Sequence, residues 1–375
     1  MKLFKSLLVA PATLGLLAPL AATANEITVN DFNPVVEETL LAGGEGLVDD
    51  HSHDGGFSET TTASFSADFA VGAVDGLGVT TLGSSVTDGN EALEAYFGFQ
   101  IDLSTSFTGE DSLDVSIDAG NGGGAATELD LNSTSDVLTV DGISYTFPVG
   151  DKVTAFVGDN TDASLLYNTA CVYGGPSNTL DDCGAQFAPI DDTNGTAAGA
   201  SYDIGNGFTA AVGYSGAGST NSGLLTKEGD DSYGGQLTYT GDSYGASVTY
   251  ANIESSAVNT TYWALNGYWA PSDSASFPSI SVGYETGDPE TAGAKDTTQY
   301  FVGLQWDEAG PGTFGVALGT DGAFAEDATE YMMYEAFYSY PVNDGMTITP
   351  LIYVRENAAS QEDQTGILVK TSFSF

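Results

Sequence analysis

The stretch GILVKTSFSF, residues 366–375, carries the pattern from which the fold of the chain is predicted. Its residues alternate between two sets with different chemistry. The first set is mostly apolar or aromatic and comprises Ile367, Val369, Thr371, Phe373 and Phe375. The second set is mostly polar and comprises Leu368, Lys370, Ser372 and Ser374. Because successive side chains of a β-strand point to opposite faces, this stretch predicts an amphipathic strand.

The same alternation recurs along the chain from Phe57 onward. Between Leu93 and Phe107, the odd positions are mostly apolar and the even positions are mostly polar or small. This pattern predicts about sixteen strands. They are 61–74, 92–107, 111–119, 142–149, 151–158, 196–204, 207–214, 232–240, 243–251, 260–270, 278–286, 297–307, 312–320, 329–340, 345–354 and 366–375.

The connections between these segments fall into two length classes. Gly205-Asn206-Gly207 and Gly241-Asp242 are hairpin signals. Long polar connections are expected at 159–195, 215–231, 287–296, 321–328 and 355–365. Outer-membrane barrels combine short periplasmic turns with long external loops. The sequence therefore predicts an all-β fold, a transmembrane antiparallel β-barrel over residues 57–375 with its apolar face turned to lipid.

The first 24 residues predict a secretory signal peptide. Lys2 and Lys5 precede an apolar stretch from Leu7 to Leu20, and Ala22-Thr23-Ala24 fits a small-residue cleavage site. A membrane anchor is the alternative, but the stretch falls short of the ~20 apolar residues that a spanning helix needs. Residues 25–56 are expected to form an acidic, flexible lead-in.

Acidic residues greatly outnumber basic ones. The chain holds 52 Asp and Glu against 7 Lys and Arg, and removal of Lys2 and Lys5 leaves a net charge near −47. Such a surface attracts cations and repels nucleic acid, which is therefore not an expected partner. Two explanations stay open: adaptation to a salty habitat, and a pore that attracts cations. The 19 Tyr and 19 Phe argue against a disordered chain.

Two cysteines, Cys171 and Cys183, lie twelve positions apart around Gly174-Gly175-Pro176. An exported chain meets an oxidising compartment, so we expect these cysteines to close one loop as a disulfide. Zinc binding is the alternative. Two ligands with no histidine nearby make a poor zinc site.

Several segments resemble porins of marine unicellular cyanobacteria. They are the opening MKLFKSLLVAPA, Gly56-Phe57-Ser58, Thr60-Thr61-Thr62, TSFTGED at 105–111, Ala119-Gly120-Asn121 and FPVGDK at 147–152. That family is related to the carbohydrate-selective porins and is often described as iron-uptake porins. The likeness runs over most of residues 57–375. Its members usually carry an N-terminal S-layer-homology domain, for which about 32 residues before the first strand leave no room.

The resemblance implies a location in the bacterial outer membrane and the passive diffusion of small hydrophilic solutes and ions, with iron or sugar uptake as the family's reported roles. It also implies contact with outer-membrane lipid, and a homotrimer, for which the sequence shows no interface. An amphipathic last strand that ends on an aromatic residue resembles the signal that the barrel-assembly machinery recognises in bacterial outer-membrane proteins. The residues in that place here are Phe373 and Phe375.

If the apolar positions of each strand face lipid, the alternate positions face the lumen. These lumen-facing candidates are Glu94, Gln100, Asp102, Asp114, Asp118 and Lys370. The chain has one arginine, Arg355, so no arginine cluster can form across a constriction. Rings of Asp and Glu favour cations. We therefore expect a water-filled, cation-preferring pore narrowed by inward loops.

No grouping of residues predicts an enzyme or a cofactor. The two histidines, His51 and His53, are candidate ligands for a divalent metal, although a solvated acidic segment is the simpler interpretation. A Ser-His-Asp site would need a histidine in the barrel region, where the sequence has none. The rival from another class is a secreted, acidic, β-rich surface or adhesion protein, which needs no lipid-facing stripe.

Overall fold

The computed structural model describes residues 60–76, 92–190, 193–218, 223–226, 229–255, 258–357 and 362–375. Phe57–Phe375 form one compact unit. The predicted signal peptide at 1–24, the predicted lead-in at 25–56, and both His51 and His53 lie outside the described residues. In the described part of the chain, no helix is long and apolar enough to cross a membrane.

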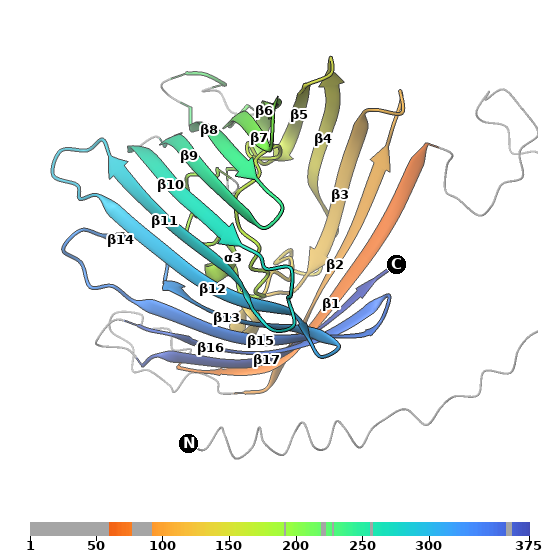
Figure 1. The fold of residues 1–375 in the computed structure, drawn as a ribbon, viewed down its shortest axis with the longest axis vertical. Coiled ribbons are helices and arrows are strands. Elements are labelled where there is room, and N and C mark those ends of the chain that lie inside the picture. The colour runs from red at the N-terminus through yellow and green to blue at the C-terminus, as the bar shows by residue number, and fades with distance from the viewer. Residues whose placement is uncertain are drawn as a thin grey trace, which may run out of the picture. The chain divides into compact units, whose positions relative to one another are not determined.

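Sixteen long antiparallel strands form a closed barrel, in which each strand pairs with its neighbours in sequence and the last strand pairs with the first (Figure 1). The strands are β1 (Thr61–Asp75), β2 (Glu94–Thr105), β3 (Ser112–Gly120), β4 (Thr139–Val149), β5 (Val153–Thr161), β6 (Gly195–Gly205), β7 (Phe208–Gly216), β8 (Asp231–Thr240), β9 (Tyr244–Glu254), β10 (Asn259–Trp269), β11 (Ser279–Pro289), β12 (Thr297–Ala309), β13 (Gly312–Thr320), β15 (Met332–Asn343), β16 (Met346–Arg355) and β17 (Gln364–Ser374).

The predicted barrel is therefore confirmed, and each of the sixteen predicted segments corresponds to one long strand. The two-residue strand β14 (Phe324–Ala325) was not predicted. It pairs with Thr297 and Thr298 of β12 in the connection between β13 and β15. Two residues are too few to show an alternating pattern, so the sequence offers no signal for it.

The two ends of the barrel differ in the length of their connections, as predicted. At one end, tight turns such as Gly205–Phe208 join neighbouring strands. Asn206 and Gly207 both have positive φ angles, 55° and 85°, which is the geometry of a type I′ hairpin turn. At the other end, longer connections join β5 to β6 and β7 to β8, as predicted, and also β3 to β4, which was not among the predicted long connections.

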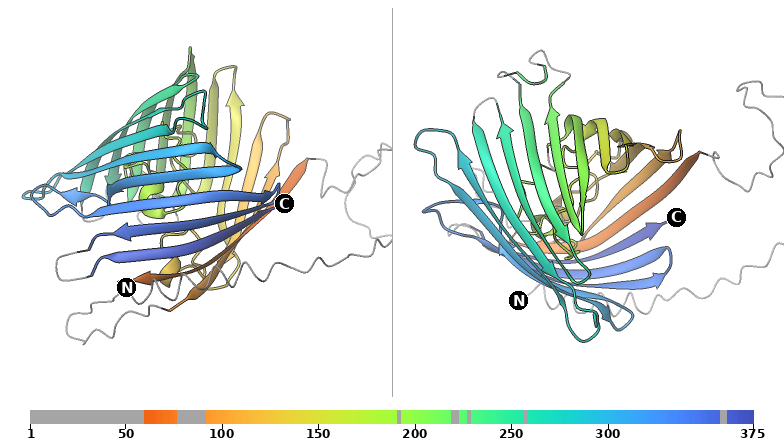
Figure 2. Two further views of the ribbon diagram at one scale, coloured as in Figure 1. Left: turned by 60° about the horizontal axis from the view of Figure 1, so that its bottom comes forward. Right: turned by 45° about the horizontal axis from the view of Figure 1, so that its top comes forward.

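The two faces of the wall have opposite chemistry. Exposed side chains on one face are large and apolar, as Val212, Trp263 and Leu265 show. On the other face, polar side chains such as Thr249 and Ser281 are buried. This is the reverse of a soluble barrel, and it matches a wall that faces hydrocarbon outside and polar groups inside. Both views in Figure 2 show the wall enclosing further segments of chain.

The barrel closes through the stretch from which its fold was predicted. Strand β17 pairs with β1 from Ser374 opposite Ser66 to Thr365 opposite Asp75. Beyond the last strand residue, the backbones of Phe65 and Phe375 exchange two hydrogen bonds of 2.9 and 3.0 Å, and their rings stack 5.6 Å apart. The β1–β17 ladder thus continues as far as Phe375, and such pairing of backbone groups is what a wall in lipid requires.

One tight connection is organised by Asp111, in the turn between β2 and β3. Its Oδ2 accepts a hydrogen bond of 2.6 Å from the Tyr145 hydroxyl. Its Oδ1 accepts hydrogen bonds from the Ser106 hydroxyl, the Phe107 amide, and both the amide and the hydroxyl of Thr108. The Tyr145 bond, with those from Thr108 and Ser106, holds the pKa of Asp111 well below its ordinary value because each bond favours the ionised carboxylate.

Because its folded pKa is depressed, Asp111 stabilises the barrel above its unfolded pKa of about 4, and the contribution disappears as pH falls through the folded value. We expect Asp111→Asn to unfold at a lower temperature than the wild type at about pH 6, and the gap to shrink toward about pH 2. Thermal unfolding in detergent measures this. Asp242→Asn, in the turn between β8 and β9, is the control. A gap of equal size at every pH would contradict the assignment.

Candidate pore and its internal loops

The connection between β5 and β6 folds into the barrel instead of extending away from it (Figure 1). We call its residues 162–190 the long inner loop; it contains the short helix α3 (Asn178–Asp181). Its backbone amides donate to polar side chains of the inner wall: Asn168 to Gln236 Oε1 (2.6 Å), Ala170 to Ser247 Oγ (3.0 Å), Val172 to Ser281 Oγ (3.0 Å) and Gly174 to Gln305 Oε1 (2.9 Å). Polar wall residues thus replace the strand partners that this irregular backbone lacks.

Two buried carboxylates of the wall hold the return half and the tip of the long inner loop. Glu285 Oε2 accepts from the amides of Phe187 (3.0 Å) and Ala188 (2.6 Å), and its Oε1 accepts from Gln299. Glu335 Oε1 accepts from the Tyr173 hydroxyl at 2.7 Å. Hydrogen bonds to an ionised or buried acceptor are among the stronger ones, and losing a partner leaves a buried polar group unsatisfied. The loop is therefore fixed against the wall of β8–β15.

The predicted disulfide between Cys171 and Cys183 is present and lies within the long inner loop. Their Cα atoms are 6.4 Å apart, and Cys183 is buried. The bridge ties the outgoing half of the loop to its returning half, on either side of α3. It therefore limits how far the two halves can separate.

A second connection, between β3 and β4, also folds inward. We call its residues 121–138 the short inner loop; it contains the single-turn helix η2 (Gly124–Ala126). Glu94 Oε2 accepts from the Ala125 amide at 2.9 Å and from the Tyr96 hydroxyl at 2.5 Å. Glu94, a predicted lumen-facing residue, thus lies on the inner side of β2 with its carboxylate engaged in holding this loop.

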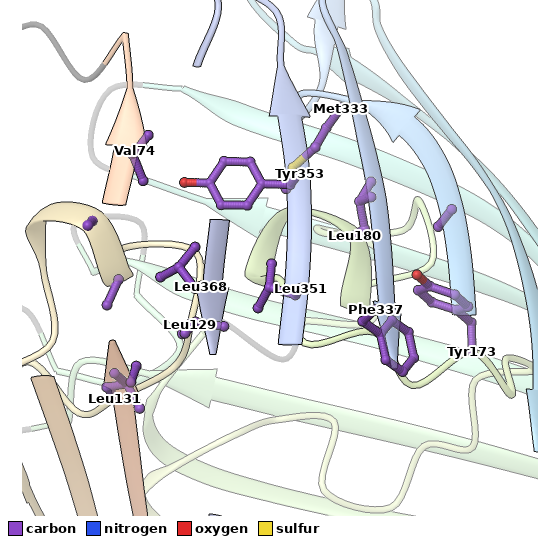
Figure 3. Packing of buried hydrophobic residues seen from close by; sticks show 14 of the residues in the cluster. Val74, Leu129, Leu131, Tyr173, Leu180, Met333, Phe337, Leu351, Tyr353 and Leu368 are labelled. Carbon is purple, nitrogen blue, oxygen red and sulfur yellow. The ribbon is translucent and has the colours of Figure 1, made fainter. Parts of the chain in front are cut away.

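The two inner loops and the wall enclose an apolar cluster inside the barrel (Figure 3). Its buried members are Ala70, Val74, Ala125, Ala126, Leu129, Leu131, Tyr173, Leu180, Cys183, Phe301, Ala317, Met333, Phe337, Leu351, Tyr353 and Leu368. This cluster was not predicted from the sequence. A signal for it exists, because Leu368 is the one apolar residue on the polar side of the last strand.

The inner face of β2 and β3 carries carboxylates whose partners are neutral. Asp102 Oδ1 accepts from Gln100 Nε2 (2.8 Å) and from the Ser116 hydroxyl (2.7 Å). Asp114 accepts from Ser112, and Asp118 from the Thr139 hydroxyl at 2.6 Å. These bonds engage one oxygen of each carboxylate without neutralising its charge. Gly98 shows that this face is the interior, since a Cβ on it would lie 3.1 Å from Cα of Leu131 in the short inner loop.

Among the described residues, the two basic side chains of the interior are each paired with acids. Lys370 Nζ lies 3.4 Å from Asp68 Oδ2, and both residues line a pocket of about 190 Å³ together with Gln100, Asp130 and Asn132. Arg355 contacts Glu128 and Asp321. The structure thus brings Gln100 and Lys370 together in one pocket. Asp102, which accepts from Gln100, lies beside it on β2, with Asp114 and Asp118 on β3.

A closed 16-stranded antiparallel barrel with an apolar exterior, a polar interior and an inward loop is the architecture of bacterial outer-membrane porins. Solved structures match it across 84% of this chain. The anion-selective porin of Comamonas acidovorans matches with a TM-score of 0.58 and 13% identity, over 99% of its own length. Pseudomonas putida OprB matches with a TM-score of 0.57 and 9% identity, over 94% of its length.

A mutant of the Rh. blastica porin matches with a TM-score of 0.55 and 14% identity, over its whole length. No family model matches the sequence, and no curated protein matches it. At these identities the likeness concerns the fold. The solutes that pass through the barrel have to be inferred from the residues of its interior.

Proposed function

We propose that this protein is an outer-membrane channel for the passive diffusion of small hydrophilic solutes and ions, and that it prefers cations. An apolar outer surface suits lipid, and a polar inner wall suits water. The long inner loop lies against β8–β15, and the short inner loop lies against part of β2 and β3. We infer that the open passage runs beside the rest of the wall of β1 to β4, which carries the polar residues described above. The predicted signal peptide at 1–24 would bring the chain to the membrane.

The charge balance of the open wall carries the proposed cation preference. We infer that Gln100, Asp102, Asp114 and Lys370 face the passage, with Glu94 beside it and the buried Asp118 close behind its surface. The carboxylates of Asp102, Asp114 and Asp118 accept only from neutral donors in the described contacts, whereas both interior bases contact carboxylates. Uncompensated negative charge on the inner wall concentrates cations and repels anions.

The resemblance to cyanobacterial porins adds narrower proposals. It supports iron or sugar as the transported solute, a homotrimer, and recognition of Phe373 and Phe375 by the barrel-assembly machinery. The stacked and edge-on contacts of Phe375 with Phe65 and of Phe373 with Phe69 support a role for these rings in closing the barrel. Which solute the channel transports has to be measured separately.

Reversal potential in a planar bilayer under a salt gradient tests the proposal, with the purified protein in its folded form. We expect discrete channel openings and a reversal potential of the sign that marks cation preference. The opposite sign would overturn the preference and leave the channel standing. Release of the protein into the medium without detergent, together with an absence of openings, would instead favour the secreted surface protein.

A further inference from the structure

The two inner loops meet at Glu128, which is buried at the centre of the short inner loop. Its Oε2 accepts from the Thr179 hydroxyl at 2.8 Å and from the Thr179 amide at 3.3 Å, and its backbone carbonyl accepts from the Asn178 amide at 3.0 Å. Thr179 and Asn178 belong to α3 of the long inner loop. Glu128 therefore receives the first turn of α3, although 51 positions separate it from Thr179.

The other oxygen of Glu128 is held by the wall. Glu128 Oε1 lies 2.8 Å from Nη1 of Arg355, the last residue of β16, and Arg355 Nε lies 2.7 Å from Asp321 Oδ1 in the connection after β13. A guanidinium can serve two carboxylates at once because its donors form a planar fork. Arg355, the single arginine of the chain, thus joins the short inner loop to β16 and to the connection at Asp321.

We propose that Glu128 and Arg355 are positioning residues that join the two inner loops into one partition, and that this junction sets the width of the passage. The inference rests on the proposed channel function. Asp130 and Asn132, which follow Glu128 by two and four positions, line the same pocket as Lys370 and Asp68. The part of the short inner loop that Glu128 anchors is therefore the part that faces the open wall.

Packing around the junction explains why it would act as a unit. Leu129 and Leu131 of the short inner loop lie in one apolar cluster with Leu180 of α3 and with Leu351 and Tyr353 of β16 (Figure 3). The side chain of Glu128 is only 4% exposed. Removal of Arg355 leaves the buried Glu128 without its charged partner, and removal of Glu128 leaves Arg355 bound to Asp321 alone. Either change therefore releases the short inner loop from β16 and favours separation of the loops.

Single-channel conductance of Glu128→Gln and Arg355→Gln tests the junction. The two substitutions change the net charge in opposite directions, so a purely electrostatic effect would move conductance in opposite directions. We expect both to raise conductance, by roughly twofold, and to admit larger neutral solutes in liposome swelling, because both release the partition. The double variant should add little to either single change, as expected for one coupled unit.

Lys295→Gln is the matched control, because it removes one positive charge from an ion pair with Asp327 whose side chains are 54% and 80% exposed. It should conduct as the wild type does. Thr179→Val, which removes the hydroxyl that Glu128 accepts without changing charge, should shift conductance in the same direction and keeps the test open if a charge variant fails to fold. A heat-induced shift on a gel reports that each barrel is folded.

The outcomes separate the two proposals. If the wild type conducts and the folded variants match it, or move in opposite directions, the junction is overturned and the channel stands. If the folded wild type conducts nothing, the channel proposal fails and the junction fails with it. Increased conductance in both variants, with Lys295→Gln unchanged, supports the junction.

Discussion

Replacing Asp102, Asp114 and Asp118 together with asparagine should bring the cation-to-anion permeability ratio close to one. These three carboxylates lie on the inner face of β2 and β3, where hydroxyl and amide groups donate to one oxygen of each without cancelling its charge. Asparagine keeps the size and can still accept from Ser116, Ser112 and Thr139. The substitution therefore changes the charge and leaves most of the local packing in place.

The expected change in the permeability ratio follows from the interaction of a mobile ion with a fixed charge. A unit charge 4 Å away contributes about 1 kcal/mol in water, which corresponds to a factor of about five in local ion concentration per carboxylate at close approach. Screening limits the effect, because the Debye length falls from about 10 Å at 0.1 M salt to 3 Å at 1 M. Both the wild-type preference and its loss should accordingly be largest in dilute salt.

Reversal potentials in asymmetric potassium chloride measure this ratio. The control replaces three other aspartates with asparagine: Asp151 and Asp242, which lie in tight turns, and Asp203, near the end of β6. It removes the same charge from the end of the barrel that carries these turns. We expect the control to keep most of the preference. A triple variant on β2 and β3 as selective as the wild type would show that other carboxylates govern the passage.

The sequence predicts the strands of the barrel wall better than the loops inside the barrel. Alternation along each strand depends only on neighbours in the chain, so all sixteen long strands could be located from it. The inner loops depend on partners that are far apart in sequence. Arg355 and Glu128 are 227 positions apart, and Gly174 and Gln305 are 131 apart. No local pattern records such pairs.

Apolar residues at inner-face positions of the strands, where a water-filled lumen would favour polar ones, are the sequence signal for the inner loops. Phe301, Phe337, Leu351 and Leu368 occupy positions whose neighbours on the same face are mostly polar, and each is buried in the internal cluster. Glycines on the inner face are a second signal, because they allow the backbone of a loop to approach the strand closely. A Cβ on Gly213 would lie 1.9 Å from the carbonyl oxygen of Ala163, at the start of the long inner loop. Breaks in the pattern thus mark the places where the wall receives the loops.

Gly283→Val should push the long inner loop away from the wall and lower the conductance. Gly283 lies on the inner face of β11, and a Cβ there would lie 1.7 Å from the carbonyl oxygen of Cys183. That oxygen accepts from Asn266 Nδ2 at 3.0 Å, and Cys183 is bonded to Cys171. The backbone must therefore move by roughly 1.5 Å or more to reach ordinary contact.

The decrease in conductance follows from the hydrogen bonds that still hold the long inner loop in the variant. Phe187 and Ala188 remain bonded to Glu285, and Tyr173 to Glu335, so the loop bows into the lumen instead of leaving it. Overpacking of this kind costs about 1–3 kcal/mol, so the unfolding temperature should fall as well. Single-channel conductance and thermal unfolding in detergent measure the two effects.

Gly235→Val is the matched control, because Gly235 lies on the outer face of β8, where the nearest atom to an added Cβ would be Ala211 O at 3.4 Å. Valine there adds apolar surface toward lipid and leaves the interior unchanged, so conductance should equal that of the wild type. A Gly283→Val barrel that conducts more than the wild type would mean that the loop detaches from β11. A barrel with unchanged conductance and stability would show that Cys183 does not press against β11, and that the close approach of the loop to the wall has been assigned wrongly.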